Sequence, residues 1–163
     1  MDQIDQIIDQ WRRERPELDP TSMGLFGRMK RLTAHIAREL ETVFAKHGMS
    51  AAGFDVMATL RRSGPPYALT PSELIAWTMV TSGTMTNRID RLVADGFVER
   101  RKNPDDGRGF VIGLTNKGKR AIDAAVDEHV ENQRTLMAPL SLKEQRQLDD
   151  LLKAWLAAFE QDE

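Results

Sequence analysis

The sequence contains no cysteine, which excludes disulfide bonds, thiolate nucleophiles and cysteine-based zinc sites. It has three histidines, His35, His47 and His129, and their scattered positions do not match the spacing of metal ligands. Gly-rich phosphate loops and a Ser/His/Asp order are also missing, and the acidic pairs at 105–106 and 149–150 fall in a turn and on a polar helix face. We therefore expect neither a metal nor a cofactor, and a protein that is not an enzyme.

Long apolar runs are missing as well. No stretch approaches the roughly 20 apolar residues that a bilayer crossing requires, and residues 1–11 are acidic where a secretory signal would be basic. With 163 residues, 40% of them hydrophobic and 29% charged, the chain suits one compact unit better than two domains. We expect a cytoplasmic protein.

The formal net charge of −2 argues against a nucleic-acid partner until its distribution is considered. Residues 81–120 contain nine Lys or Arg and five Asp or Glu, a net of +4, whereas residues 1–20 and 121–163 have nets of −3 and −6. A basic centre between acidic ends can present a positive face to phosphate groups while the whole protein stays soluble.

Apolar residues recur at helical spacing at both ends of the chain. The pattern predicts a short helix over 4–11, a long helix over 25–43 and a third helix around Met57. Thr115 and Ser141 are suited to cap two further helices, the last of which has a wide apolar face. These terminal helices either pack within one chain or are covered by a partner subunit, and periodicity leaves both alternatives open.

The segment 70–114 combines two short helices with a basic hairpin. A capping box at 70–73 begins the first helix, and apolar residues at 85, 89 and 92 form the buried stripe of the second. Strand-forming residues at 97–102 and 110–114 enclose a stretch rich in turn residues. This order predicts a helix-turn-helix followed by a β-hairpin wing.

The second of these helices has a polar face opposite its buried stripe, which could read bases in a major groove. A polar helix face can also be merely solvated. The outward residues are Ser82, Thr84, Thr86, Asn87 and Arg91.

Four consecutive motifs resemble those of the MarR family of transcription regulators. They read Thr86-Asn87-Arg88-Ile89-Asp90-Arg91-Leu92, Gly96-Phe97-Val98-Glu99-Arg100-Arg101, Asn103-Pro104-Asp105-Asp106-Gly107-Arg108 and Leu114-Thr115-Asn116-Lys117-Gly118. The resemblance extends over about 25–159 and implies a homodimer that binds double-stranded DNA at a palindromic site. It also implies that Arg108 enters the minor groove, where Gly109 replaces the second basic or polar residue of many relatives.

Four further residues resemble the signature of the family's urate-responsive branch: Trp11, Asp55, Arg88 and Arg100. The resemblance implies that they form a site for a small anionic aromatic effector, urate or a related purine. A phenolic or other aromatic acid is the alternative effector. In the structural alternative, Asp55 and Arg88 only form a salt bridge that holds the recognition helix, and Trp11 belongs to the dimer core.

The resulting prediction is a mainly α fold with a small β-hairpin wing, a winged helix-turn-helix with N- and C-terminal dimerisation helices. Residues 1–47 and 115–163 are assigned to dimerisation, with a ligand-site contribution from the former, and residues 48–114 to DNA binding. We predict a DNA-binding regulator, most simply a repressor. A helical interaction protein that does not bind DNA is the rival, although it leaves the basic hairpin unexplained.

Overall fold

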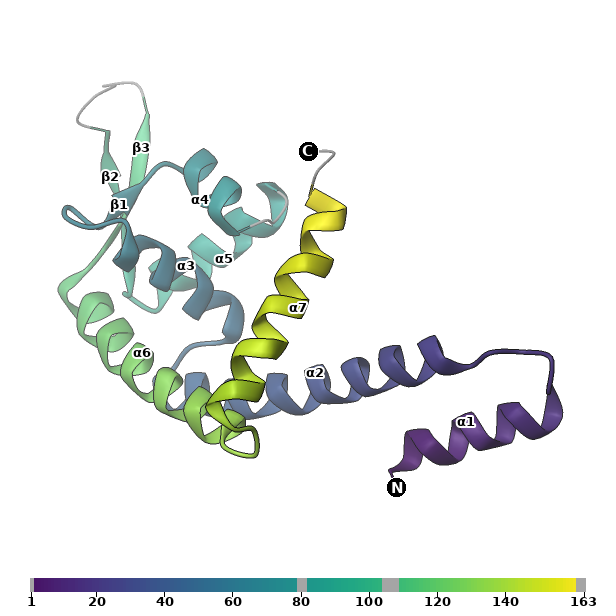
Figure 1. The fold of residues 1–163 in the computed structure, drawn as a ribbon. Helices are drawn as coiled ribbons and strands as arrows, with labels where there is room; N and C mark the ends of the chain where they lie inside the picture. The colour runs from purple at the N-terminus through teal and green to yellow at the C-terminus, as the bar shows by residue number, and fades with distance from the viewer. Residues whose placement is uncertain (1, 79–81, 104–108, 161–163) are drawn as a thin grey trace.

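The computed structural model describes residues 2–78, 82–103 and 109–160, and for Ser82 only the backbone. Helices make up most of this part, with a small antiparallel sheet (Figure 1). The elements are α1 (Gln3–Glu14), α2 (Thr21–Lys46), α3 (Ala51–Arg62), β1 (Ala68–Leu69), α4 (Pro71–Thr78), α5 (Ser82–Ala94), β2 (Val98–Lys102), β3 (Phe110–Leu114), α6 (Asn116–Met137) and α7 (Leu142–Glu160). The predicted fold class, a mainly α winged helix-turn-helix, is confirmed.

Side-chain caps fix where several helices begin. Thr70 and Glu73 form a reciprocal capping box at the start of α4, as the sequence predicts. The Thr115 hydroxyl accepts a hydrogen bond from the Gly118 amide at 2.9 Å, and Ser141 and Glu144 form a second box before α7. Each such cap stabilises its helix by about 1 kcal/mol.

The lobe, defined here as residues 48–114, closes its hydrophobic core together with one face of α6 and Phe44 of α2. Leu60, Leu74, Met85, Ile112 and Ile122 are fully buried in it. The sheet order is β1-β3-β2, with Leu69 opposite Ile112 and Val98 opposite Leu114. Sequence analysis missed β1, because a strand of two residues is too short to show a period of two.

α1 and the first half of α2 form an arm that projects away from the lobe (Figure 1). Ile4 and Ile8 of α1 are buried against Gly24 and Gly27 of α2, where a Cβ at Gly27 would lie 3.1 Å from the Ile4 side chain. Arg28 adds a hydrogen bond of 2.9 Å to Asp2. The arm is therefore a packed helical hairpin.

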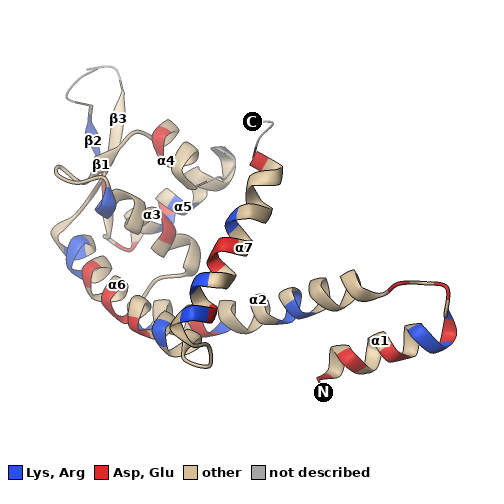
Figure 2. Ribbon diagram, in the orientation of Figure 1, with Lys and Arg blue, Asp and Glu red and all other residues tan. Residues whose placement is uncertain are grey.

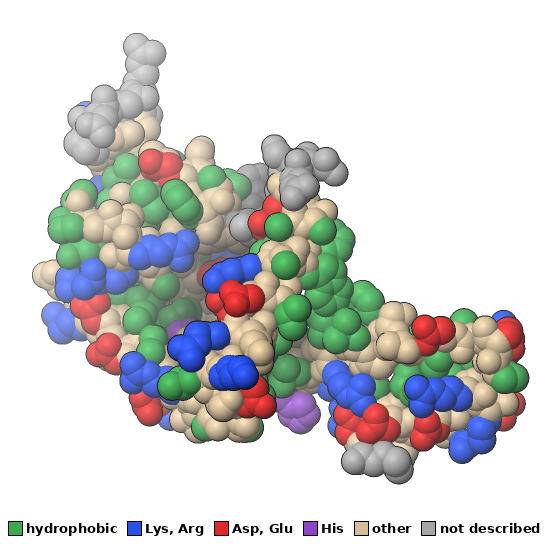
Figure 3. Space-filling view, viewed as in Figure 1, with side chains coloured by type: hydrophobic (Ala, Val, Ile, Leu, Met, Phe, Trp, Pro, Cys, Tyr) green, Lys and Arg blue, Asp and Glu red, His purple; other side chains and the backbone are tan. Residues whose placement is uncertain are grey.

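The arm and α7 keep large apolar side chains exposed. No described residue of α7 is buried, although its Trp155 contacts Phe26 of α2 edge to face, with ring centroids 5.6 Å apart. Apolar atoms gather where α7 meets α2 (Figure 3). The most exposed are Leu25, Phe26, Leu32, Leu142, Leu151, Leu156 and Phe159. None of the described helices is both long and apolar enough for a membrane span.

Candidate nucleic-acid interface

α4 and α5 form the two helices of the helix-turn-helix. Met85, Ile89 and Leu92 hold α5 in the core, so the opposite face of α5 is turned outward. Four of the predicted contact residues lie on this face with exposed side chains: Thr84, Thr86, Asn87 and Arg91. Ser82 is the first residue of α5, but its side chain lies outside the described part, as does Arg108.

The wing is attached to one flank of α5. Arg100 of β2 donates a hydrogen bond to Asp90 of α5, and its guanidinium also lies over the Phe110 ring, 5.8 Å from the centroid. Arg101 donates to the Leu114 carbonyl at 2.8 Å, next to Gly113. Blue segments on β2 and at the start of α6 contrast with the acidic residues along α1 and α7 (Figure 2).

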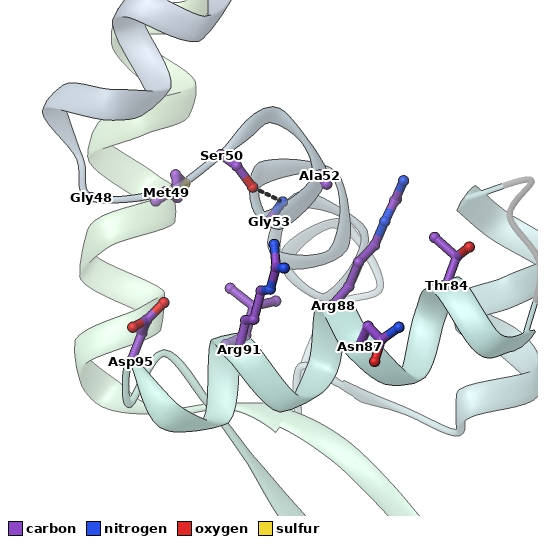
Figure 4. A pocket seen from close by; sticks show the side chains of 11 residues that line it. Gly48, Met49, Ser50, Ala52, Gly53, Thr84, Asn87, Arg88, Arg91 and Asp95 are labelled. Atoms are coloured by element: carbon purple, nitrogen blue, oxygen red, sulfur yellow. Dashed lines mark hydrogen bonds between the residues drawn. The ribbon is translucent and has the colours of Figure 1, made fainter.

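A hollow of about 450 Å³ lies on the other flank of α5, beside the first turn of α3. Arg91 points from α5 toward this turn, where the Ser50 hydroxyl accepts a hydrogen bond from the Gly53 amide (Figure 4). The lining residues are Gly48, Met49, Ser50, Ala52, Gly53, Thr84, Asn87, Arg88, Arg91, Leu92 and Asp95. Two guanidinium groups, those of Arg88 and Arg91, and the positive end of the α3 dipole border this hollow. Asp95 is the carboxylate of its lining, and Asp55 lies 3.9 Å from Arg88, so an anion bound here would compete with these carboxylates.

Arg88 forms only a loose ion pair. Its Nη1 lies 3.9 Å from Asp55 Oδ2 of α3, beyond hydrogen-bond distance. The Arg88 side chain is 22% exposed, and Nη1 is buried without a hydrogen-bond partner among the described residues. An unsatisfied buried donor costs free energy, so an acceptor that reached Nη1 would be favoured.

The structure brings two of the four predicted effector residues together. Asp55 and Arg88 face each other across α3 and α5, while Arg100 binds Asp90 on a different side of α5. Trp11 lies on α1 in the arm, in a shallow hollow with Gln10 and Glu14. Within one protomer, α1, which contains Trp11, lies far from α3 and α5, which contain Asp55 and Arg88 (Figure 1).

Sequence analysis missed two features of this interface. It did not identify Asp90 as the partner of Arg100, because residues ten apart on different elements share no periodicity. It also missed the first turn of α3 as a flank of the recognition helix. The Ser50 cap could have been recognised from the residue type, but its position beside Arg91 depends on the tertiary structure.

Comparison with known proteins identifies the family. A family model described as MarR family matches residues 47–109. The HTH-type transcriptional regulator PecS of Dickeya dadantii is 41% identical over 150 residues, which cover 92% of this chain and 90% of the relative. The chain belongs to the MarR family. The MarR multiple antibiotic resistance protein of Escherichia coli is 40% identical over 70 residues, 43% of this chain and 46% of that protein.

Solved structures of MarR proteins agree with this membership. A mutant Escherichia coli MarR in complex with operator DNA superposes with a TM-score of 0.71 and 28% identity, and the match covers 90% of this chain and 97% of that chain. AbsC of Streptomyces coelicolor, at 20% identity and a TM-score of 0.77 over 87% of this chain and 96% of AbsC, has the same fold. This protein is therefore a MarR-family DNA-binding transcriptional regulator.

Proposed function

We propose that this protein represses transcription by binding a palindromic operator as a homodimer. α5 enters the major groove and the wing follows the adjacent minor groove, with Arg108 inserted there. The observation that carries the proposal is the outward polar face of α5, flanked by the wing on one side and the positive hollow on the other. The base and phosphate contacts come from Ser82, Thr84, Thr86, Asn87 and Arg91.

Each side chain on α5 has a distinct role in this arrangement. Asn87 lies on the outward face and suits bidentate contact with adenine. Arg91 points into the hollow beside α3, so it binds a backbone phosphate together with the α3 N-terminus. Asn87 then contributes specificity, and Arg91 contributes affinity for any sequence.

Residues 1–47 and 115–163 form the dimer in this proposal, and residues 48–114 bind DNA. A C2 dimer presents two copies of α5, which matches a site with two half-sites one helical turn apart. The exposed apolar side chains of α2 and α7 are the surface that the second copy covers.

A small anionic aromatic effector releases the protein from DNA, with urate as the first candidate and a phenolic or other aromatic acid as the alternative. This part is supported by Arg88 Nη1, which is buried and has no hydrogen-bond partner among the described residues. An anion bound by Arg88 competes with Asp55, and Trp11 is the proposed aromatic residue of the site. Arg100, the fourth predicted residue, is bound to Asp90 on a different side of α5 and could act on the site only if this pair opened. Because Arg88 belongs to α5, a ligand that repositions it favours a state with lower DNA affinity.

Fluorescence anisotropy tests both levels of the proposal. A labelled duplex from upstream of this protein's own gene is titrated at several salt concentrations, with a shuffled duplex as control. We expect specific binding that weakens steeply with salt, because phosphate contacts release counterions. Specific binding that urate does not weaken would exclude urate but keep the regulator. Equal affinity for both duplexes, or no dependence on salt, would contradict operator binding at this site.

A further inference from the structure

α5 ends in a turn around Gly96. The Gly96 amide donates a hydrogen bond to the Val93 carbonyl at 3.0 Å, and the Phe97 amide donates to the Leu92 carbonyl at 2.9 Å. The φ of +73° at Gly96 is a conformation that glycine adopts without strain. The Asp95 carbonyl takes no part in these two hydrogen bonds. Because the C-terminal end of a helix carries partial negative charge, this carbonyl favours a cation.

Lys117 in the first turn of α6 supplies this cation. Its Nζ donates a hydrogen bond to the Asp95 carbonyl at 2.6 Å and lies 4.7 Å from the centroid of the Phe97 ring. The ammonium group therefore makes a charge-assisted hydrogen bond and a cation–π contact at once. Both contacts are with residues that follow α5, so Lys117 caps the C-terminal end of the recognition helix from a neighbouring helix.

The backbone from which Lys117 extends is itself fixed to the same turn. The Thr115 amide donates to the Phe97 carbonyl at 3.0 Å, and the Thr115 hydroxyl donates to the Gly96 carbonyl at 2.8 Å. Gly118 packs so closely that a Cβ there would lie 1.9 Å from the Phe97 carbonyl oxygen. The first turn of α6 cannot slide along the end of α5 without breaking these contacts, so the position of the Lys117 ammonium is well defined.

Arg91 lies one hydrogen bond away from this cap. The Asp95 amide donates to the Arg91 carbonyl at 2.9 Å, and this bond closes the last turn of α5. Arg91 and Asp95 both line the hollow beside α3 (Figure 4). The last turn of a helix frays when its carbonyl groups are left unsatisfied. A frayed turn at this point would change the direction of the Arg91 side chain, which begins in it.

From these contacts we infer that Lys117 is a positioning residue for DNA binding and that it acts through Arg91. The Lys117 ammonium keeps the last turn of α5 closed, and the closed turn directs the Arg91 guanidinium toward the DNA backbone. Lys117 itself does not touch the DNA. The inference rests on the proposed phosphate contact of Arg91, and it adds a residue from outside the DNA-reading face, on a helix assigned to dimerisation.

A double-mutant cycle separates action through Arg91 from direct contact with DNA. Anisotropy measures the operator Kd of the wild type, Lys117→Gln, Arg91→Ala and the double variant at one salt concentration. We expect Lys117→Gln to raise the Kd about threefold in the wild type, the usual strength of a cation at a helix C-terminus, and to leave it unchanged in Arg91→Ala. Lys117→Arg, which retains a cationic donor, should restore most of the affinity. Lys119→Gln is the matched control for the lost charge, because Lys119 binds Asp123 of its own helix.

Amide hydrogen exchange on the free protein tests the cap without DNA. The amides of Asp95, Gly96 and Phe97 all donate within the turn that Lys117 holds. We expect these three amides to exchange faster in Lys117→Gln than in the wild type, and to recover their protection in Lys117→Arg. A purely structural role of Lys117 would instead accelerate exchange throughout the lobe.

Several results would overturn the inference, and they differ from failure of the proposed function. If Lys117→Gln raised the Kd equally in the wild type and in Arg91→Ala, Lys117 would bind DNA itself, while the phosphate contact of Arg91 would stand. An unchanged Kd for Lys117→Gln, or unchanged exchange at the three amides, would show that the ammonium does not hold the turn. If Arg91→Ala bound DNA as the wild type does, the proposed phosphate contact would fail, and the inference would fail with it.

Discussion

Arg100 Nη2 donates a hydrogen bond to Asp90 Oδ1 at 2.5 Å, which joins the first strand of the wing to the recognition helix. Both side chains are about half exposed, at 42% and 54%, so the pair adds little to stability. Because the pair joins β2 to α5, we expect its effect to be on the position of the wing relative to the helix. In the proposed complex the wing and the helix enter adjacent grooves together, so the angle between β2 and α5 would affect DNA binding.

Arg100→Lys keeps the charge but loses the planar guanidinium that reaches Asp90. We expect operator affinity to fall about threefold, equivalent to about 0.7 kcal/mol, with the dependence on salt unchanged. Anisotropy across a salt series measures both quantities. Arg134→Lys, in an exposed pair on α6, is the matched control and should match the wild type. If the slope of log affinity against log salt concentration fell by about one, the value of one phosphate contact, Arg100 would instead bind the DNA backbone itself.

Arg91→Ala and Asn87→Ala separate affinity from specificity on one helix face. Arg91→Ala should weaken binding to operator and shuffled DNA alike and lower the salt slope by about one. Asn87→Ala should cost about 1–3 kcal/mol on the operator only, and leave the slope unchanged. The same anisotropy titrations measure both variants. An Arg91→Ala variant that lost affinity for the operator alone would assign base contact to Arg91.

Gly118 permits the first turn of α6 to pass directly over the Phe97 carbonyl. A Cβ at Gly118 would lie 1.9 Å from that oxygen, so Gly118→Ala must displace either α6 or β2. We expect a loss of about 3 kcal/mol in the free energy of unfolding, at the upper end of the usual range for overpacking. Gly83→Ala is the matched control in a second helix, because nothing lies within 4 Å of its added Cβ. Urea denaturation followed by circular dichroism compares the two, and equal stabilities would refute the steric argument.

His129 packs against the rings of Phe44 and Phe54, and its Nδ1 has no hydrogen-bond partner among the described residues. Burial lowers the pKa of His129 below its ordinary value of 6.5, because desolvation disfavours the imidazolium form. Just below pH 6.5 the unfolded chain therefore binds more protons than the folded chain, so the free energy of unfolding falls as the pH falls through this range.

His129→Phe should reduce this loss of stability between about pH 7.5 and pH 5.5. This range extends about one pH unit either side of the ordinary histidine pKa. Urea denaturation at each pH measures the free energy of unfolding, and His35→Gln, at an exposed histidine, is the control. The carboxylates of Asp123 and Glu128 affect the free energy of unfolding only at lower pH. Hydrogen bonds from Lys119 and Lys46 lower their pKa values below 3.8 and 4.5, so their contribution is lost only in stronger acid. Identical pH dependence in wild type and His129→Phe would rule out His129 as the source.

Features encoded within a few residues of each other could be predicted from the sequence. The capping box of Thr70 and Glu73, the Thr115 cap and the buried stripe of α5 all depend on local spacing, and the structure contains each of them. The four motifs of the winged helix also gave the family. A strand as short as β1, in contrast, leaves no local pattern.

Features that depend on tertiary distance could not be predicted. Sequence analysis grouped Asp55 with Arg88, either in an effector site or in a salt bridge. It could not predict the 3.9 Å separation at which Arg88 Nη1 has no hydrogen-bond partner among the described residues. It grouped Arg100 with them, whereas Arg100 is bound to Asp90. It also grouped Trp11 with them, because residue types do not show that the length of α2 separates Trp11 from the lobe of its own chain. These differences arise from how rigid helices are joined, which residue types alone do not specify.

α7 buries none of its described residues within its own chain, whereas the core of the lobe is closed by the lobe together with residues of α2 and α6. In the proposed homodimer, the exposed face of α7 would gain its stability only when two chains meet, so that this stability would depend on protein concentration. When little of the protein is present, a duplex with two adjacent half-sites would hold two lobes near each other. This raises the local concentration of the exposed apolar helix faces. The operator would then act as a template for assembly, and its occupancy would rise more steeply than in proportion to the amount of protein made.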